Sequence, residues 1–418
     1  MSRALIFFCL LATLSAQSQE LIRSYVQNSS VRLTAISPDT TDYTDLEPLA
    51  HAIGGSRVVM LGEQDHGDAP AFSAKIRIIK FLHEKMGFNV LAFESDFFGL
   101  NYSQFGANPD SFFKATIPPI WTYCKTCTPL FGQYLIATRQ TPRPLLLSGF
   151  DSQIGMRYTI PLLDSVMRQL QLPLTHEPEY SDQRLPLLKK GSMYSNDTLL
   201  NRSYLALLDT VKEQLLLKLR ADDFWCMITD NLQQLKQEMM TLTPNLSDGF
   251  AERMNGRDRQ MAANLRWICE KKYPGEKIIV WAHNYHVSKG SGHYKEAFKN
   301  STTSMGTFFT RDSQWMRQTY IIGFASYEGT AGRLSRQPQV YKLPKPPANS
   351  YENWIDKSWD YAFTDFRRFT DDHPDFHTPF SMAGGSNNRP YHRYSEEEWT
   401  RIFDGIVFIR KMYSCIGL

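Results

Sequence analysis

The sequence has no excess of charge of either sign. Its 418 residues include 46 Lys and Arg against 43 Asp and Glu, which gives a formal net charge of +3. Nucleic acids and anionic membrane surfaces attract proteins that concentrate positive charge. The composition therefore predicts a globular protein that has neither of these as a partner.

Long hydrophobic runs are also missing beyond the N-terminus, so we expect no membrane span. At the N-terminus, Arg3 precedes an apolar run from Ala4 to Leu14, and small residues follow at Ala16 and Ser18. This run is too short to cross a bilayer comfortably, and its layout is that of a secretory signal peptide. We expect residues 1–18 to direct export to the periplasm or the exterior. A buried N-terminal helix is the alternative.

Several catalytic signatures are absent. The chain has no G-x-S-x-G nucleophile elbow, no H-E-x-x-H zinc motif, no Walker A motif and no G-x-G-x-x-G dinucleotide fingerprint. These motifs carry the reacting serine, the metal ligands or the phosphate cradle of their enzyme classes. Their absence argues against a serine hydrolase and against a nucleotide-dependent enzyme.

Cysteine is scarce. The region after the predicted signal contains five cysteines, at positions Cys124, Cys127, Cys226, Cys269 and Cys415. An odd number at irregular spacing is not a disulfide framework. Cys124 and Cys127 form a C-x-x-C without the second pair that a zinc site needs, and nearby prolines predict a loop. We predict an optional local disulfide between these two residues.

What the sequence does contain is a series of short apolar runs that are bounded by turn signals. Runs of this kind are typical of strands buried on both faces of a parallel sheet. Between them, apolar residues at helical spacing predict a helix over Ala71–Met86, which Gly87 ends. The alternation predicts an α/β fold with a three-layer core and a mainly parallel sheet. The predicted strands are Arg57–Leu61, Asn89–Phe93, Pro144–Ser148, Lys277–Ala282, Thr319–Phe324 and Gly405–Ile409.

The middle of the chain differs from this pattern. Residues 159–254 are mostly helical in character, for example over Ser203–Leu219 and Phe224–Thr241. No Gly/Ser-rich or Pro-rich linker flanks this stretch, as would be expected of an independent domain. We predict a helical insertion within one domain that spans residues 19–418.

Ionisable residues stand at the ends of the predicted strands. In open parallel sheets, ligands bind outside the carboxyl ends of the strands. These side chains are therefore expected to converge on one polar pocket, although each alone could be a cap or a surface residue. They are Glu63 and His66 after the first strand, Glu94 after the second, Asp151 after the third, and His283 and His286 after the fourth.

Such a pocket suits hydrolysis. A histidine takes a proton from water near neutral pH, and a neighbouring carboxylate fixes its tautomer. A second histidine or an arginine can stabilise the oxyanion that develops on the substrate. We expect no cofactor, but two alternatives stay open at this point. The same side chains could hold zinc or manganese in a metallohydrolase, or exposed His and Tyr could ligate haem in a binding protein.

These motifs resemble those of the erythromycin esterase-like family. The resemblance covers most of the chain after residue 18, in the same order, and the set is specific. It includes GEQDHG followed by a helix and by a strand that ends in Glu94. The matching segments are Gly62–Gly67, Gly149–Asp151, Arg257–Asn264 and Trp281–His286.

The resemblance implies metal-independent hydrolysis of an ester or lactone in a small molecule, with macrolide ring opening and antibiotic resistance as the best-studied case. It places the general base on His66 and the essential carboxylates on Glu63 and Glu94. It places a second pair of functional histidines on His283 and His286. These five residues are the predicted catalytic set.

The resemblance also implies substrate-binding residues and shows departures from the family pattern. Arg257 is a predicted site residue, with a structural salt bridge to Asp258 as the alternative. Lys75 matches a position where an arginine is common, and Arg77 keeps its own counterpart. We expect these three and Asp151 to contact the substrate. Asp68–Ala71 replaces a segment that carries Thr and Glu in the family.

Overall fold

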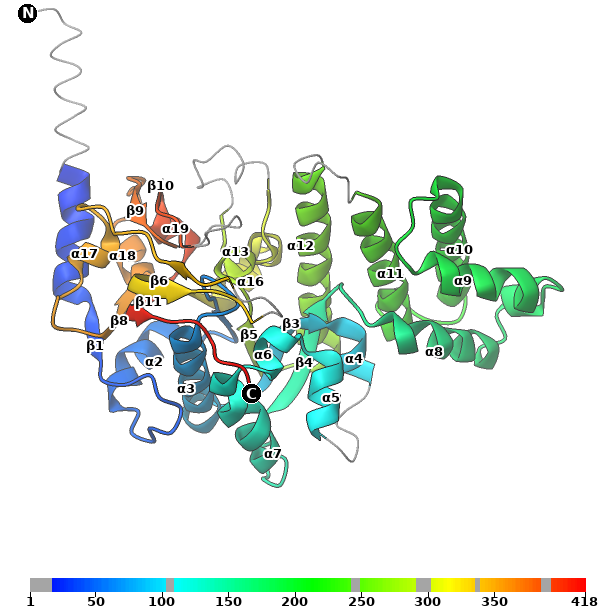
Figure 1. Cartoon of the computed structure of the whole chain (residues 1–418), viewed down its shortest axis with the longest axis horizontal. Helices are drawn as coiled ribbons and strands as arrows, with labels where there is room; N and C mark the ends of the chain where they lie inside the picture. Colours follow the sequence, from blue (N-terminus) through cyan, green and yellow to red (C-terminus); the bar gives the residue numbers. More distant parts are fainter. Residues whose placement is uncertain (1–16, 103–108, 242–248, 291–301, 335–338, 385–391) are drawn as a thin grey trace, which may run out of the picture. The chain divides into compact units, whose positions relative to one another are not determined.

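The protein divides into two compact units in a computed structural model that describes residues 17–102, 109–241, 249–290, 302–334, 339–384 and 392–418. The first unit contains residues 1–91, 118–146 and 277–418. The second contains residues 92–117 and 147–276. The chain therefore leaves the first unit twice and returns to it twice. Figure 1 shows the elements of both units.

The first unit contains a sheet whose central strands are parallel. Strand β2 (Val58–Leu61) pairs in parallel with β5 (Lys277–Trp281) on one side and with β6 (Thr319–Ala331) on the other. Strand β11 (Gly405–Met412) pairs in parallel with β6. The remaining pairs are antiparallel and join β8 (Tyr361–Asp365) to β11, β1 (Val31–Leu33) to β8, and β7 (Tyr341–Lys342) to β6. The prediction of an α/β fold with a mainly parallel sheet is confirmed.

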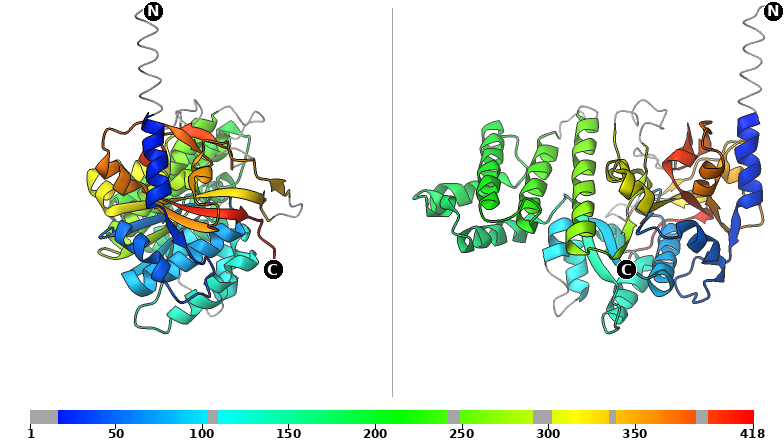
Figure 2. Two further views of the ribbon diagram at one scale, coloured as in Figure 1. Left: turned by 90° about the vertical axis from the view of Figure 1, so that its left-hand side faces the viewer. Right: turned by 180° about the vertical axis from the view of Figure 1, so that it is seen from behind.

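Helices cover both faces of this sheet, as Figures 1 and 2 show. On one face lie α2 (Glu47–Ile53) and α3 (Ala69–Met86). On the other lie α17 (Tyr351–Trp354), α18 (Phe366–Asp372) and α19 (Trp399–Ile402). Gly87 adopts a left-handed conformation, with a φ of 73°, and ends α3 as expected. Apolar side chains can cover both sides of the central strands because those strands are buried between two helical layers.

The other elements of the first unit are short. They are the 17–29 helix, η1 (Thr44–Leu46), α6 (Pro119–Thr122), η2 (Lys125–Cys127), η3 (Pro129–Tyr134), α7 (Leu135–Thr138), α13 (Asn284–Val287), α15 (Met305–Thr310), α16 (Ser313–Gln318), β9 (Phe380–Met382) and β10 (Ser395–Glu397). Strands β9 and β10 form a separate antiparallel pair.

Strand β3 (Phe88–Asp96) runs from the first unit into the second, and β4 (Leu146–Asp151) follows it in the order of the sheet. All six predicted strands are present, but four of them, β3, β4, β6 and β11, continue further than expected. Glu94 therefore lies inside β3, Asp151 is the last residue of β4, and residues 326–328 lie inside β6. Backbone pairing continues through these polar residues, so polarity alone did not mark the strand ends.

The rest of the second unit is helical. Its core is built from apolar side chains such as Leu163, Leu208 and Leu232, which are fully buried. The helical stretch between β4 and β5 begins before residue 159 and ends after residue 254. The elements of this unit after β3 are α4 (Phe97–Tyr102), α5 (Pro109–Thr116), α8 (Met156–Gln169), η4 (Pro173–His176), η5 (Tyr180–Arg184), α9 (Leu185–Gly191), α10 (Thr198–Leu216), α11 (Phe224–Met240), α12 (Phe250–Trp267) and η6 (Ile268–Lys272).

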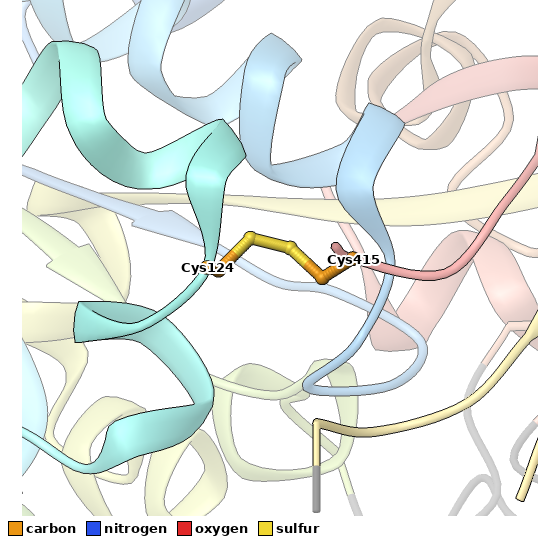
Figure 3. Close-up of a disulfide and its surroundings, with 2 residues drawn as sticks. All are labelled: Cys124 and Cys415. Atoms are coloured by element: carbon orange, nitrogen blue, oxygen red, sulfur yellow. A yellow bond between two sulfur atoms is a disulfide. The ribbon is translucent and has the colours of Figure 1, made fainter. Parts of the chain in front are cut away.

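A disulfide joins Cys124 to Cys415 across 291 residues of sequence (Figure 3). The predicted bond between Cys124 and Cys127 is therefore wrong, and Cys127 is a buried free thiol. The C-terminal tail brings Cys415 to Cys124. Next to the disulfide, the carbonyl of Ile416 in this tail accepts from the N–H of Lys125 at 2.9 Å. A partner so distant in sequence is invisible to spacing rules.

The predicted signal peptide falls almost entirely outside the described residues, which begin at residue 17. Gln17 and Ser18 are part of the 17–29 helix. Within the described ranges, every helix is either too short or too polar to cross a bilayer.

Candidate active site

We call the loop after β2, residues 62–68, the catalytic loop because it carries the first predicted catalytic residues. The two neighbouring strands hold it. The N–H of Gly62 donates to Ile322 at 2.9 Å, and the N–H of Asn284 donates to the carbonyl of Glu63 at 2.8 Å. The parallel pairing thus continues beyond the end of β2. Glu63 is consequently fixed at the carboxyl edge of the sheet, next to the start of α13.

Glu63 is fully buried between two basic side chains. Its Oε1 lies 2.9 Å from Nδ1 of His66, and its Oε2 forms an ion pair with Lys75. Burial raises the pKa of Glu63 to about 7, while the positive charge of Lys75 opposes that shift. The carboxyl group can therefore exchange a proton near neutral pH.

The carboxylate of Glu63 determines which nitrogen of His66 can accept a proton. An ionised carboxylate only accepts hydrogen bonds, so Nδ1 of His66 carries the hydrogen and Nε2 carries the lone pair. The imidazole ring stands edge-on to Trp121, with 5.0 Å between ring centroids, and 5.2 Å from the ring of His283. The side chain of His66 is 12% exposed. This environment holds the ring in place and leaves it partly open to solvent.

His283 has a different character from His66. Its Nε2 donates to the carbonyl of Gln64 at 2.6 Å, and its Nδ1 accepts from the N–H of Tyr285 at 3.1 Å. Burial, together with charge repulsion from His66, His286 and Arg333, holds the pKa of His283 well below its usual range. A neutral ring with both nitrogens engaged is suited to holding the loop and α13 together. This geometry does not support the predicted role of His283 in oxyanion stabilisation or proton shuttling.

His286 lies in α13 on the same side as His283. The two ring centroids are 6.4 Å apart, and the side chain of His286 is buried. The three-residue spacing around one helical turn thus brings both histidines to the same place, as the sequence predicted.

Lys75 and Arg77 were both expected to contact the substrate, and the structure places them otherwise. Lys75 is completely buried, with its ammonium group on Glu63 and 4.2 Å from the ring centroid of Trp281. Arg77 forms an ion pair with Asp45 at 2.6 Å and donates to the carbonyl of Ala35 at 2.8 Å. Lys75 thus positions the catalytic loop, whereas Arg77 ties α3 to the segment before α2.

Glu94, Asp151 and Arg257 form a second cluster, which belongs to the second unit. The guanidinium group of Arg257 binds Asp151 through two nitrogens, at 3.1 and 2.6 Å, and lies 3.3 Å from Oε1 of Glu94. Burial lowers the pKa of Arg257, but the two carboxylates outweigh it and hold that pKa well above the usual range. Arg257 is therefore a permanent cation between two buried anions.

Apart from Arg77, which pairs with Asp45, the predicted site residues thus fall into two clusters, one in each unit. Glu63, His66, Lys75, His283 and His286 lie together in the first unit, and Glu94, Asp151 and Arg257 lie together in the second. Among the described residues, the structure has no group of three or more His, Cys, Asp or Glu side chains arranged to hold a metal ion.

Sequence reasoning missed two residues beside the catalytic loop. Trp121 forms the ring contact with His66, and Arg333 forms an ion pair with the buried Asp65 of the loop. A lone Trp or Arg far away in the sequence carries no motif, so no pattern in the sequence indicated either one.

Comparisons with known proteins agree with this architecture. The family model described as erythromycin esterase matches residues 148–412. Among curated proteins, the chain is 29% identical over 358 residues to YbfO of Bacillus subtilis (strain 168), whose name assigns it provisionally to the hydrolases. The match covers 77% of each protein.

Solved structures show the same fold. A Bacillus cereus protein of known structure superposes with a TM-score of 0.71 at 21% identity, covering 95% of this chain and 98% of that one. A histidine-to-asparagine mutant of the erythromycin esterase EreC, in its open conformation, superposes with a TM-score of 0.64 at 19% identity. That match covers 93% of this chain and 98% of EreC.

Proposed function

Because the chain belongs to the erythromycin esterase family, and is on that basis an ester-bond hydrolase, we propose that it opens a carboxylic ester or lactone with water activated by His66. The observation that carries this proposal is the contact between Glu63 and His66. A histidine that donates from Nδ1 to a buried carboxylate presents Nε2 as a general base.

The reaction follows from this pair. Nε2 of His66 takes a proton from water while the water oxygen bonds to the acyl carbon. The imidazolium that forms is stabilised by Glu63, whose own position is held by Lys75. When the tetrahedral intermediate collapses, the bond from the acyl carbon to the alkoxy oxygen breaks. His66 returns the proton to that oxygen, which restores the base.

The other predicted residues take different parts in this proposal. His283 keeps Gln64, and with it the catalytic loop, in place. We keep His286 as a site residue because its ring lies next to that of His283. Glu94 and Asp151 fix the guanidinium group of Arg257, and we retain this cluster as the substrate-binding part of the second unit.

The proposed substrate is a small molecule with an ester or lactone bond, and a macrolide lactone is the leading candidate. Its support is the match to the erythromycin esterase family and the fold shared with EreC. Chemistry at an acyl carbon needs no metal when a histidine–carboxylate pair activates the water. We therefore propose metal-independent hydrolysis, with full activity expected after dialysis against EDTA, checked together with elemental analysis of the dialysed protein.

We also propose that the protein is exported. The layout of residues 1–18 supports this, as does the disulfide between Cys124 and Cys415, because such bonds persist in oxidising compartments. Fractionation of cells that express the full chain tests the proposal. Accumulation of an unprocessed protein in the reducing cytoplasm would contradict it.

The decisive experiment incubates the pure protein with a panel of macrolides and simple esters, and mass spectrometry detects products that have gained one water. His66→Ala should lose about 10²–10⁴-fold in kcat with an unchanged circular dichroism spectrum. His51→Ala is the matched control, because His51 is exposed on α2, and it should keep full activity. Equal activity in His66→Ala and the wild type would refute the assignment.

A further inference from the structure

The first unit has a cavity that shares no residue with the catalytic loop or with α13. The cavity has a volume of about 480 Å³ and lies between α16, α18, α19 and the segment that follows α13. Cavities of about 300–1,000 Å³ are typical of small-molecule sites. The charged side chains in its lining are Lys289, Arg317, Arg367, Asp371, Arg401 and Asp404.

Asp404, just before β11, is a buried acid that holds two of these cations in place. Its carboxylate forms ion pairs with Lys289 and, at 2.8 Å, with Arg367, and it accepts from the N–H of Ile321 at 2.8 Å. Burial raises the pKa of Asp404, but the two cations outweigh it and hold that pKa below its usual range. Asp404 is therefore an anion that fixes both cations at the wall of the cavity.

Two cations are more than one carboxylate needs. A single positive charge neutralises Asp404, so Lys289 and Arg367 together leave a surplus of one. Their side chains are 16% and 25% exposed, against 2% for Asp404. Because the acid is hidden and both cations are partly open, this wall of the cavity is positively charged.

Arg317 and Arg401 add to this charge. Arg401 donates to the carbonyls of Pro374 and Phe376, and carbonyl groups are neutral, so these bonds hold the guanidinium group without neutralising it. Arg317 is exposed on α16. The second acid of the lining is Asp371, which is exposed on α18.

The lining of the cavity thus has four basic side chains against two acidic ones, a surplus of two positive charges. The whole chain has a formal surplus of only three. Positive charge that is concentrated in a concave surface raises the local concentration of anions. The charge balance therefore indicates an anionic ligand.

A phosphate monoester matches this cavity in charge and in geometry. It carries about −1.5 to −2 charges at pH 7, close to the surplus in the lining, whereas a carboxylate carries one. Guanidinium groups bind phosphate oxygens through paired N–H donors, and an ammonium group adds a point charge. Thr370 and Thr400 also line the cavity and bring hydroxyl groups to it.

The size of the cavity favours an organic phosphate over the inorganic ion. Inorganic phosphate has five heavy atoms, and one water molecule takes about 30 Å³ in the liquid. A cavity of about 480 Å³ has room for many more atoms than the ion contains. The remaining space suits the alcohol part of an ester.

From these observations we propose that this cavity binds a small organic molecule through its phosphate monoester group. Lys289, Arg367 and Arg401 bind the phosphate oxygens, and Arg317 attracts the anion from solvent. Asp404 is a positioning residue that holds Lys289 and Arg367. The inference goes beyond the proposed ester hydrolysis and does not depend on it, and it involves no covalent step.

Calorimetry with glycerol phosphate tests the proposal on the full protein. The wild type should bind one molecule of glycerol phosphate, should bind inorganic phosphate more weakly, and should not bind glycerol. Raising the NaCl concentration from about 50 to about 300 mM should weaken the binding, because salt screens partly exposed charges.

Three substitutions locate the site. Arg401→Met should weaken the binding of glycerol phosphate by about tenfold or more, because it removes a hydrogen bond to a charged group. Arg317→Met, at an exposed side chain, should weaken it by about two- to fivefold. Arg368→Met is the matched control, because Arg368 is exposed on the same helix as Arg367 but lines a different hollow, and it should bind as the wild type does.

Two further variants guard against artefacts. Arg401→Lys keeps the positive charge, so it should fold even if the methionine variant does not, and should bind more tightly than Arg401→Met. His66→Ala should bind glycerol phosphate with the affinity of the wild type, whether or not the protein hydrolyses esters. Loss of binding in His66→Ala would place the anion at the catalytic loop and refute the inference.

The remaining outcomes are equally decisive. A wild type that does not bind glycerol phosphate would overturn the inference and leave ester hydrolysis untouched. Unchanged affinity in both Arg317→Met and Arg401→Met would also contradict it. A loss in Arg368→Met as large as that in Arg401→Met would show a general effect of charge rather than a site.

Discussion

The side chain of Asn284 occupies the space beside Gly62 that any larger residue would need. An ideal Cβ on Gly62 would overlap Oδ1 of Asn284. That oxygen accepts from the N–H of Phe324 at 3.0 Å, and the amide nitrogen donates back to the carbonyl of Phe324 at 2.8 Å. Asn284 thus joins the ends of β2 and β5 to the middle of β6 just before Glu63, and its side chain has no freedom to yield.

Gly62→Ala should therefore be both less stable and less active than the wild type. The added methyl group must displace Asn284 or the loop, and overpacking of this kind costs about 1–3 kcal/mol. Urea denaturation measures the loss of stability, and ester hydrolysis measures displacement of the loop. Gly55→Ala is the control, because no atom lies within 4 Å of an added Cβ there. Equal free energies of unfolding for Gly62→Ala and Gly55→Ala would show that the loop can move aside more easily than this contact implies.

The rate of hydrolysis should rise with pH around 7. The carboxyl group of Glu63, whose pKa burial raises to about 7, must be ionised to stabilise the imidazolium of His66. A profile of kcat/KM against pH should show this ionisation. In Glu63→Gln activity should be strongly reduced, and the rise of kcat/KM with pH that is due to Glu63 should disappear. If kcat/KM of that variant rose with pH as in the wild type, the ionisation would belong to another group.

The same carboxyl group makes a pH-dependent contribution to stability. Its pKa is higher in the folded chain than the ordinary value of 4.5, so the native state binds the proton more tightly than the unfolded state does. This contribution is fully present below pH 4.5 and is lost as the pH rises through 7. The free energy of unfolding of the wild type, relative to that of Glu63→Gln, should therefore fall between these pH values in urea titrations. A difference that stays constant would contradict the raised pKa.

Reduction of the disulfide should weaken both the fold and the catalytic loop. The tail that carries Cys415 is bonded to that loop, since the N–H of Cys415 donates to the carbonyl of Gly67 at 2.8 Å. Cys415→Ser should lower the free energy of unfolding by about 2–4 kcal/mol and should reduce kcat. Dithiothreitol should have the same effect on the wild type and none on the variant. Mapping by mass spectrometry should find a peptide linking Cys124 to Cys415, and a peptide linking Cys124 to Cys127 would disprove the pairing.

Removal of the positive charge of Arg257 should lower the free energy of unfolding more than removal of the negative charge of Asp151, which binds it. Arg257→Met leaves Glu94 and Asp151 buried without their counter-charge, which should lower stability by about 3–5 kcal/mol. Asp151→Asn leaves Arg257 in contact with Glu94 and should cost less. Denaturation of both single variants and of the double variant measures the coupling. A double variant whose loss is the sum of the two single losses would show that the residues act independently.

The sequence by itself determined the local structure and most of the site chemistry. Continuous apolar runs predict β2 and β5 because strands buried on both faces need apolar side chains on both sides. Helical spacing followed by Gly87 predicts α3 to within two residues at its start. The GEQDHG motif carries Glu63 and His66 three residues apart, and a turn of that length is enough to bring them into contact. These features depend on residues that are close along the chain.

The tertiary structure alone decided which distant groups meet. Cys124 bonds to Cys415 rather than to Cys127 because the C-terminal tail folds back past the catalytic loop. Lys75 and Arg77, two residues apart on α3, point to different partners because a helix turns by about 200° over two residues. Arg333 reaches Asp65 across 268 residues of sequence. Local periodicity contains no information on such pairs, since packing of whole strands and helices brings them together.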